Sequence, residues 1–392
     1  MPFATFDELI AFLPQLESPL HEMQDIILAN LVAIGEIPAP TFEERKRVEF
    51  LQERFTDIEM LDCSTDEMEN VYAILPGETG EKHLLVTAHL DTIFPDDDDH
   101  TITMSADEVT GTAVADNSLG IAVMASLPYL LRRLNLRLQS NVILMGAART
   151  LGRGNLAGLR FFLENSRMPI QAGIAVEGIE LGRLSYSSVG MLRGEITCLV
   201  PDDYDWTRFD TTGAITNLNE VINQILALPL PRQPRTSVVL GSIEGGEQAY
   251  GKIAKFAQLR FEIRSESADV VESIREEIQE IVMEQAAKTN KTITAEFFGK
   301  RTPGGLAISH PLCRQTRRIM EALSIEPHIS PSLSGLSAFI DRKIPAITLG
   351  ITKGQRTKDP EETILIAPIA KGVAQLIGVL LAIDGGFCDE TR

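Results

Sequence analysis

Three short apolar runs, each separated from the next by a helical pattern, constrain the fold of this chain most strongly. The runs cover residues 83–90, 141–148 and 172–179. Each is almost continuously apolar, which is typical of a strand buried on both faces of a sheet. Between them, residues 117–134 and 154–165 have helical patterns. Strands that alternate with helices predict an α/β fold with a doubly wound, mostly parallel sheet covered on both faces.

The pattern changes from about residue 191. Residues 192–200 and 257–265 alternate between apolar and polar side chains, as strands with one solvated face do. Amphipathic helices are predicted near 214–228 and at 268–289, where apolar residues recur at helical spacing. Half-solvated strands with two helices predict an α+β domain inserted into the larger α/β domain.

The first pattern resumes after residue 300. A helix at 311–323, an apolar strand at 344–350 and a last helix within 362–383 are predicted there. The sequence therefore predicts a discontinuous α/β domain made of residues 1–190 and 301–392, interrupted by an α+β domain at 191–300.

Charge and hydropathy exclude two classes of partner. The formal net charge of -19 argues against nucleic acid, because phosphate contacts need clustered Lys and Arg. The apolar stretch at 372–383 is too short to span a bilayer as a helix. The amino terminus has no basic region followed by an apolar one, so no signal peptide is evident. We therefore expect no membrane contact and a cytoplasmic location.

Polar residues gather after the first apolar run. His89 and Asp91 come at the carboxyl end of a predicted strand, where open α/β sheets bind ligands. A metal-binding histidine usually donates its other ring N–H to a neighbouring acceptor, and Asp91 is near enough in sequence to accept it. Asp116 precedes a predicted helix. These residues are candidates for a metal site; the alternative is a hydrogen-bonded histidine and a helix-capping aspartate.

Two segments together distinguish these readings. HLDT at 89–92 and ADNSLG at 115–120, with GNLAG at 154–158, resemble the metal-binding segments of the dinuclear zinc exopeptidases. That family includes aminoacylases, glutamate carboxypeptidases, tripeptidases and desuccinylases. The resemblance implies a zinc-binding α/β domain with an inserted lid domain. It also implies a homodimer formed through 191–300, and a small-molecule or peptide ligand in the cleft between the domains.

The resemblance assigns one zinc site completely. In the family, one zinc is bound by the histidine of HLD, the aspartate of ADN and a later acidic residue. Those positions are His89, Asp116 and Glu177 here, and Asp91 would orient His89. One nitrogen and two carboxylate ligands are sufficient for a single zinc with an open position. We expect at most one zinc per chain.

The second half of the family's site is incomplete. Where the family has GEEGLGNLRG, this chain has RTLGRGNLAG, which puts Thr150 in the position of the general base and Leu151 in that of a zinc ligand. Residues 141–163 contain no Asp or Glu, so no shift of alignment supplies either. Arg356 stands at the position of the family's last histidine ligand. We expect its guanidinium to pair with Asp116 in place of a second metal.

The inserted domain also departs from the family. The family's lid supplies a histidine to the substrate, and residues 191–300 contain none. Arg264 lies in the segment FEIRSES, which resembles a strand of the family's lid, and is expected to bind substrate. The family's lid asparagine corresponds to Gly251 here.

These differences predict impaired catalysis. A missing general base costs about 10²–10⁴ in rate, or roughly 3–5 kcal/mol of barrier. The leading hypothesis is a pseudoenzyme of the metallopeptidase family that acts as a binding or regulatory protein. One alternative is a mononuclear-zinc hydrolase of peptide or N-acyl amide bonds that uses another base. A third is a structural partner that assembles with an active relative.

Overall fold

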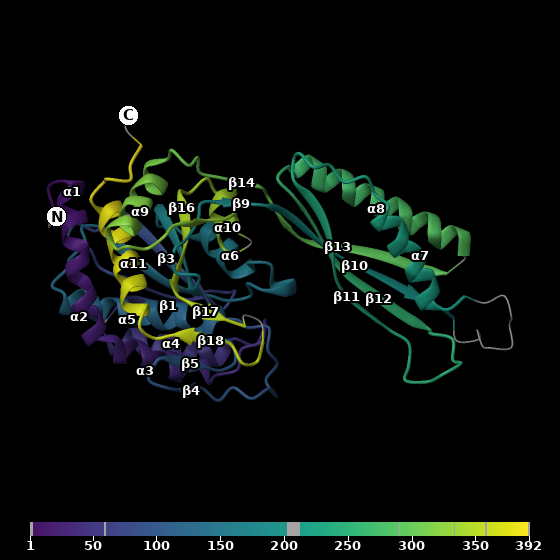
Figure 1. Ribbon diagram of the computed structural model, residues 1–392, viewed down its shortest axis with the longest axis horizontal. Coiled ribbons are helices and arrows are strands. Elements are labelled where there is room, and N and C mark those ends of the chain that lie inside the picture. Colours follow the sequence, from purple (N-terminus) through teal and green to yellow (C-terminus); the bar gives the residue numbers. More distant parts are fainter. Residues whose placement is uncertain are drawn as a thin grey trace. The chain divides into compact units, whose positions relative to one another are not determined.

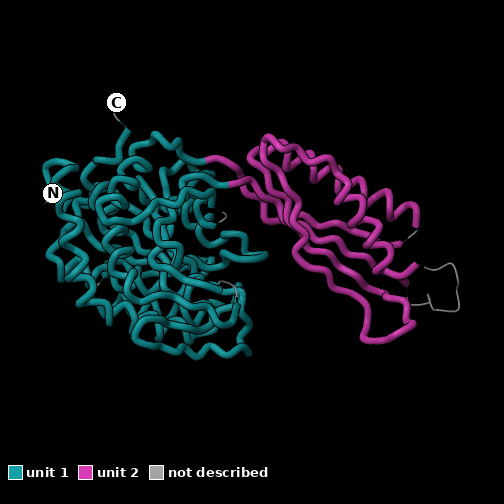
Figure 2. The backbone as a smooth tube through the Cα atoms, in the orientation of Figure 1, with its two compact units in different colours: residues 1–188, 305–392 teal, residues 189–304 magenta. Residues whose placement is uncertain are grey.

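The chain folds into two compact units, which Figure 2 shows in different colours. Unit 1 contains residues 1–188 and 305–392, and unit 2 contains residues 189–304. The computed structural model describes residues 3–58, 60–201, 212–289, 291–332, 334–356 and 359–390. The chain crosses between the units at 188/189 and 304/305, where the sequence had placed the crossings at 190/191 and 300/301.

The core of unit 1 is an eight-stranded sheet with the order β1-β2-β6-β3-β7-β16-β8-β15. The strands are β1 (Leu61–Thr65), β2 (Val71–Leu75), β3 (His83–His89), β6 (Asn141–Ala147), β7 (Ile170–Ile179), β8 (Arg183–Ser185), β15 (His328–Ile329) and β16 (Ala346–Thr352). The four central strands β6, β3, β7 and β16 are parallel to one another. Antiparallel strands extend this centre on both sides. The predicted mostly parallel α/β fold is confirmed.

Helices cover both faces of this sheet (Figure 1). They are α1 (Phe6–Phe12), α2 (Glu17–Glu22), α3 (Gln24–Gly35), α4 (Arg45–Asp57), α5 (Leu119–Arg133), α6 (Ala157–Asn165), α9 (Pro311–Ala322), α10 (Leu336–Asp341) and α11 (Ile369–Asp384). Successive residues of β3 point to opposite faces. Leu84 and Val86 pack against the side that carries α1–α5, α9 and α11. Leu85 packs with α6 and α10 on the other side.

Two helices of unit 1 are almost wholly buried. Every residue of α11 except Lys371 is buried, so this last helix belongs to the core. The segment Val114–Arg133, which contains α5, is long and apolar enough to cross a membrane, but 89% of its apolar window is buried inside the protein. A buried core helix explains its composition.

A small four-stranded sheet adjoins the main one. It contains β4 (Thr103–Met104), β5 (Glu108–Thr110), β17 (Gly354–Gln355) and β18 (Thr363–Leu365), in the order β17-β18-β5-β4. The last helix, predicted within 362–383, is α11, which begins after the residues of β18.

Unit 2 is an antiparallel sheet covered by two helices. Its strands are β10 (Gly190–Leu199), β11 (Thr236–Gly245), β12 (Phe256–Ser265) and β13 (Thr292–Arg301), in the order β11-β12-β10-β13. Alternate residues of β10 and β12 are buried against α7 (Ala214–Leu226) and α8 (Ala268–Thr289). The α+β organisation and both helices agree with the sequence pattern. Short strands β9 (Ser187–Ser188) and β14 (Gly304–Gly305) pair where the chain enters and leaves this unit.

Candidate metal centre

Three potential metal ligands from separate segments meet at the carboxyl edge of the main sheet. His89 is the last residue of β3, and Glu177 lies near the end of β7, the neighbouring parallel strand. Asp116 lies in the turn at 114–118 that leads into α5. One ligand atom from each residue lies within 4.8 Å of the others. The structure thus brings together the three residues that the resemblance assigned to one zinc.

His89 is held by hydrogen bonds at both ring nitrogens. Nδ1 lies 2.9 Å from the backbone oxygen of Asp91, and because a carbonyl only accepts, Nδ1 carries a proton and donates it. Nε2 lies 2.9 Å from Oδ1 of Asp116 and 3.9 Å from Oε2 of Glu177. The ring therefore presents Nε2 to the two carboxylates, which is the orientation of a metal-binding imidazole.

Burial and mutual proximity shift the pKa values of the acids and the imidazole in this cluster. Burial on its own would lower the pKa of His89, but the hydrogen bond to Asp116 and the nearby acids outweigh it, so the pKa is raised well above its usual value. Burial raises the pKa of Glu177, and Asp116 raises it further. The carboxylates thus need a positive charge beside them. Nitrogen and carboxylate donors facing one point fit a zinc ion, which would supply that charge.

Asp91 has a different role from the expected one. Its Oδ1 is 3.6 Å from His89 Nδ1, beyond hydrogen-bond distance, so its backbone oxygen and not its carboxylate orients the ring. Its Oδ2 accepts hydrogen bonds from the backbone N–H of Thr150 at 2.9 Å and of Leu151 at 2.7 Å, and from the Thr41 hydroxyl at 2.9 Å. The carboxylate anchors the loop after β6.

Hydrogen bonds to the Asp91 carboxylate therefore hold the loop that carries Thr150 and Leu151. Thr150 is buried, and its hydroxyl has no hydrogen-bond partner among the residues that the structure describes. Neither side chain can accept a proton at neutral pH or bind a metal as a carboxylate does. The loop keeps its place at the sheet edge although it carries neither acid.

Buried charges that the sequence did not reveal support the same loop. Glu44 Oε1 accepts a hydrogen bond from the backbone N–H of Arg149 at 2.7 Å, and burial raises the pKa of this carboxyl group. Arg47 is fully buried and donates to the backbone oxygens of Ile37 and Leu90 at 2.8 and 3.1 Å. Burial lowers the pKa of Arg47 to about 10, although Asp91 opposes the shift.

Asn117 fixes the distance between the two carboxylates of the cluster. It is completely buried; its amide nitrogen donates to the backbone oxygen of Val176 at 2.8 Å, and its oxygen accepts from the N–H of Gly178 at 2.9 Å. These two backbone groups flank Glu177. One side chain therefore binds both sides of Glu177 while its own neighbour, Asp116, enters the cluster.

Glu362 holds Asp116 from the other side. It is fully buried, and its Oε2 accepts hydrogen bonds from the backbone N–H groups of Ala115 at 2.8 Å and Asp116 at 3.1 Å. Nothing in the spacing of the sequence predicts this contact, because it joins the turn before α5 to a segment near the end of the chain.

The expectation for Arg356 is wrong. Its guanidinium pairs with Glu361 at 2.5 Å instead of Asp116, and 56% of the side chain is exposed. The physical reason is local: the acidic residue five positions later lies within reach in the same surface loop. Among the residues that the structure describes, His89, Asp116 and Glu177 form the one group of acids and histidines able to hold a metal.

Arg264 lies in unit 2, away in sequence from every residue of the cluster. It sits near the end of β12, and its guanidinium pairs with Glu262 at 2.5 Å. Glu262 also pairs with Arg193 on the adjacent strand β10 at 3.1 Å. The expected role of Arg264 in substrate binding stays a prediction. Gly251, at the position of the family's lid asparagine, adopts a positive φ of 75° in a turn.

Both units match known peptidase families in sequence. Residues 209–290, within unit 2, match the peptidase dimerisation domain. Residues 70–148, within unit 1, match peptidase family M28. The second match covers β3, the HLDT and ADNSLG segments and β6. No curated protein matches the sequence significantly.

Solved structures share the fold across nearly the whole chain. The di-peptidase Dug1p from Saccharomyces cerevisiae is 11% identical, with a TM-score of 0.80 over 97% of this chain and 99% of its own. A tripeptidase from Staphylococcus aureus is 15% identical, with a TM-score of 0.72 over 92% and 98%. A dinuclear metal-binding peptidase of the M20 family from Bacillus subtilis is 13% identical, with a TM-score of 0.62 over 93% and 99%.

Proposed function

We propose that the chain is an impaired member of the zinc exopeptidases of the M20 type, which binds one zinc ion and a peptide or N-acyl amide ligand without efficient hydrolysis. The observation that carries this proposal is the contrast at the carboxyl edge of the sheet. His89, Asp116 and Glu177 converge there, whereas the loop that would supply the base has Thr150 and Leu151.

Each residue of the cluster has a distinct part in holding the ion. His89 Nε2 and the carboxylates of Asp116 and Glu177 are the ligands, and the Asp91 carbonyl fixes the tautomer of His89. A bound zinc ion supplies a Lewis acid for a carbonyl oxygen of the ligand. Three protein ligands leave a coordination position open for that oxygen.

Proton transfer is the step that these residues do not support. Hydrolysis of an amide needs a group that takes a proton from water and gives it to the leaving nitrogen. The Thr150 hydroxyl is not basic at neutral pH, and Glu44, the acid that binds the same loop, is buried and accepts a hydrogen bond from the backbone N–H of Arg149. Loss of this group alone lowers the rate by about 10²–10⁴.

A mononuclear-zinc hydrolase is the second candidate, and the complete three-residue cluster favours it. Zinc content and activity separate the two. We expect about one zinc per chain in the purified protein, loss of that zinc in His89→Ala, and no amide hydrolysis above background with di- and tripeptides or N-acyl amino acids. Hydrolysis that a chelator abolishes and His89→Ala removes would refute impairment and establish the second candidate.

A gain-of-site experiment tests the assignment of the missing half. The triple variant Thr150→Glu, Leu151→Glu and Arg356→His should raise the zinc stoichiometry above that of the parent chain. The matched control carries Gln at all three positions, which adds comparable bulk without carboxylate or imidazole donors. Equal zinc contents in the triple variant and the control would contradict the assignment.

We also propose that the chain forms a homodimer through unit 2. The match to a peptidase dimerisation domain supports this, as do the exposed apolar side chains Val239 and Ile243 on the edge strand β11. An edge strand offers unpaired backbone groups to a second copy. Light scattering should give twice the mass of one chain, and Ile243→Lys should reduce it; a monomer at all concentrations would contradict the proposal.

A further inference from the structure

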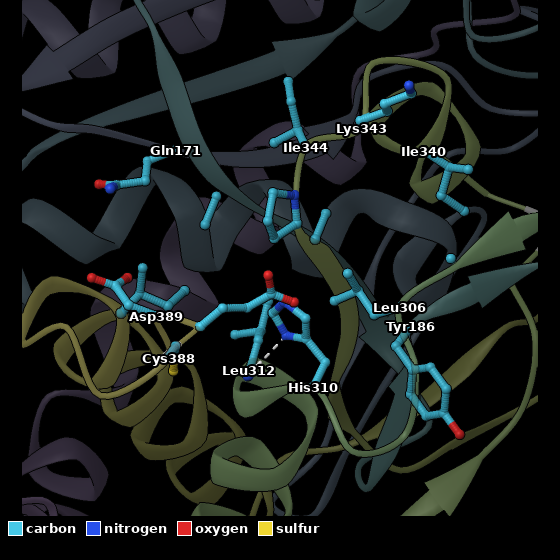
Figure 3. A pocket seen from close by; sticks show the side chains of 16 residues that line it. Gln171, Tyr186, Leu306, His310, Leu312, Ile340, Lys343, Ile344, Cys388 and Asp389 are labelled. Carbon is cyan, nitrogen blue, oxygen red and sulfur yellow. Dashed lines mark hydrogen bonds and ion pairs between the residues drawn. The ribbon is translucent and has the colours of Figure 1, made fainter. Parts of the chain in front are cut away.

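A cavity lies within unit 1, at the opposite edge of the sheet from the metal centre. Its volume is about 630 Å³, and Figure 3 shows the side chains that line it. The cavity is lined at the start of β7 by Gln171 and Ala172 and at the start of β16 by Ala346. Glu177 of the metal centre is six residues further along β7, about 20 Å at the rise of an extended strand. The two sites are therefore separate.

The walls of the cavity are apolar. The residues that form them are Leu306, Leu312, Ile340, Ile344, Pro345 and Ile383. Cys388 adds a neutral thiol, because burial raises its pKa to about 12. A concave site of this size with apolar walls and a few polar groups is the usual form of a small-molecule site.

Charges of opposite sign lie on two sides of the cavity. Figure 3 shows Lys343 on one side and Asp389 on the other, and Glu390 follows Asp389. Lys343 forms no ion pair with any residue that the structure describes. Asp389 is 3.8 Å from the amino group of Lys82, which lies outside the cavity lining.

The carboxylate of Glu390 lies beside the His310 ring, which does not neutralise it. Its Oε1 is 3.5 Å from Nε2 of His310. The backbone N–H of Leu312 donates to Nδ1 of His310 at 3.1 Å, so Nδ1 is unprotonated and Nε2 carries the proton. The imidazole therefore orients the carboxylate of Glu390 without neutralising it.

We propose that this cavity binds an apolar zwitterion. The ligand is a small molecule whose amino group meets Glu390 and Asp389, whose carboxylate meets Lys343, and whose apolar body lies against the walls between them. Such a ligand places an opposite charge beside each end of the cavity. An amine or a carboxylic acid alone leaves one end without a counter-charge, so each binds less tightly.

The cavity also borders the two connections between the units. Tyr186 and Leu306 line it, and the N–H of Leu306 donates to the backbone oxygen of Tyr186 at 2.8 Å. The two residues lie within two positions of the chain crossings at 188/189 and 304/305. A bound ligand covers this hydrogen bond and should slow hydrogen exchange of the Leu306 amide, which gives a readout specific to the cavity.

Three probes of equal length test the proposal by calorimetry and hydrogen exchange. On the full chain, 6-aminohexanoate should bind more tightly than hexylamine and hexanoate and should slow exchange at Leu306. Lys343→Gln should weaken 6-aminohexanoate about two- to five-fold, the range of an exposed ion pair, and leave hexylamine unchanged. Glu390→Gln should weaken 6-aminohexanoate and hexylamine and leave hexanoate unchanged.

Two further variants separate this site from others. Lys353→Gln removes an exposed lysine of the same unit that does not line the cavity, and should change nothing. His89→Ala should also leave binding of 6-aminohexanoate intact, because the metal centre is not involved. No binding of 6-aminohexanoate, equal affinity for all three probes, or loss of binding in His89→Ala or Lys353→Gln would overturn the proposal.

Discussion

Replacement of Asn117 by alanine should loosen the metal centre by a predictable amount. Pairing between β3 and β7 ends at Ala175, so beyond that point β3 no longer pairs with β7. The Asn117 amide takes the place of a strand and satisfies the backbone oxygen of Val176 and the N–H of Gly178. Asn117→Ala leaves both groups buried without a partner, at about 1–3 kcal/mol each. The expected loss is therefore about 2–6 kcal/mol, a large share of the roughly 5–15 kcal/mol that a domain has.

Hydrogen exchange across residues 172–179 measures this loss where it occurs. The free energy of opening of β7 should fall by the amount above in Asn117→Ala, and the zinc affinity should fall with it, because Asp116 and Glu177 lose their common brace. A decrease below about 1 kcal/mol would mean that water or a shifted backbone satisfies the two groups, and would refute the reasoning.

Asn117→Asp is the matched control, because it keeps the size and the acceptor but loses the donor. Its carboxylate would face the Val176 oxygen, which raises the carboxyl pKa in the folded protein above the unfolded value of about 3.9. Stability is then fully present at low pH, where the protonated carboxyl group donates, and is lost as pH rises through the folded pKa. A stability difference from the parent chain that does not depend on pH would contradict this.

Three further substitutions probe neighbouring features. Glu362→Gln removes a buried carboxylate from the N–H groups before Asp116, and zinc titration should show an affinity about 10–100-fold lower. Arg356→Ala breaks only the exposed pair with Glu361, so the free energy of unfolding in urea should change by less than about 1 kcal/mol. The zinc content should not change, and loss of zinc would show that Arg356 contributes to the metal centre. Burial raises the pKa of Glu44, so stability falls as pH rises from the unfolded value of about 4.3 through the folded pKa. Glu44→Gln should flatten that slope in urea midpoints between pH 4 and 7, and an unchanged slope would contradict the shift.

The sequence predicted the parts of the fold in which one chemical pattern extends over many residues. Apolar runs located β3 and β6, and helical spacing located α8 with the bounds that the structure has. Short strands such as β8 and β18 were not predicted, because two or three residues are too few to show a hydrophobic period.

Of the site, His89 and Asp116 were candidates because they follow a predicted strand and precede a predicted helix, and Glu177 came from the resemblance to the zinc exopeptidases. The supporting contacts could not be predicted. Glu362 reaches the backbone before Asp116 across more than 240 positions of sequence, and the Asp91 carboxylate turns to the loop after β6. In both, a carboxylate accepts from backbone N–H groups, and the identity of the donating residue does not reveal such a contact. The expected pair of Arg356 with Asp116 was wrong because an alignment gives the position of a residue but not the direction of its side chain.

The position of β8 in the sheet sets an order of events during synthesis. This strand is made before unit 2, yet its two partners in the sheet, β15 and β16, both follow unit 2 in the chain. The buried helix α11 is made last of all. A nascent chain must therefore hold its main sheet without β15 and β16 while the whole of unit 2 leaves the ribosome. Unit 2, whose strands and helices are contiguous, can fold first. Shortening the carboxyl end should thus harm unit 1 far more than unit 2, and a chaperone that meets this protein would meet the exposed edge of β7.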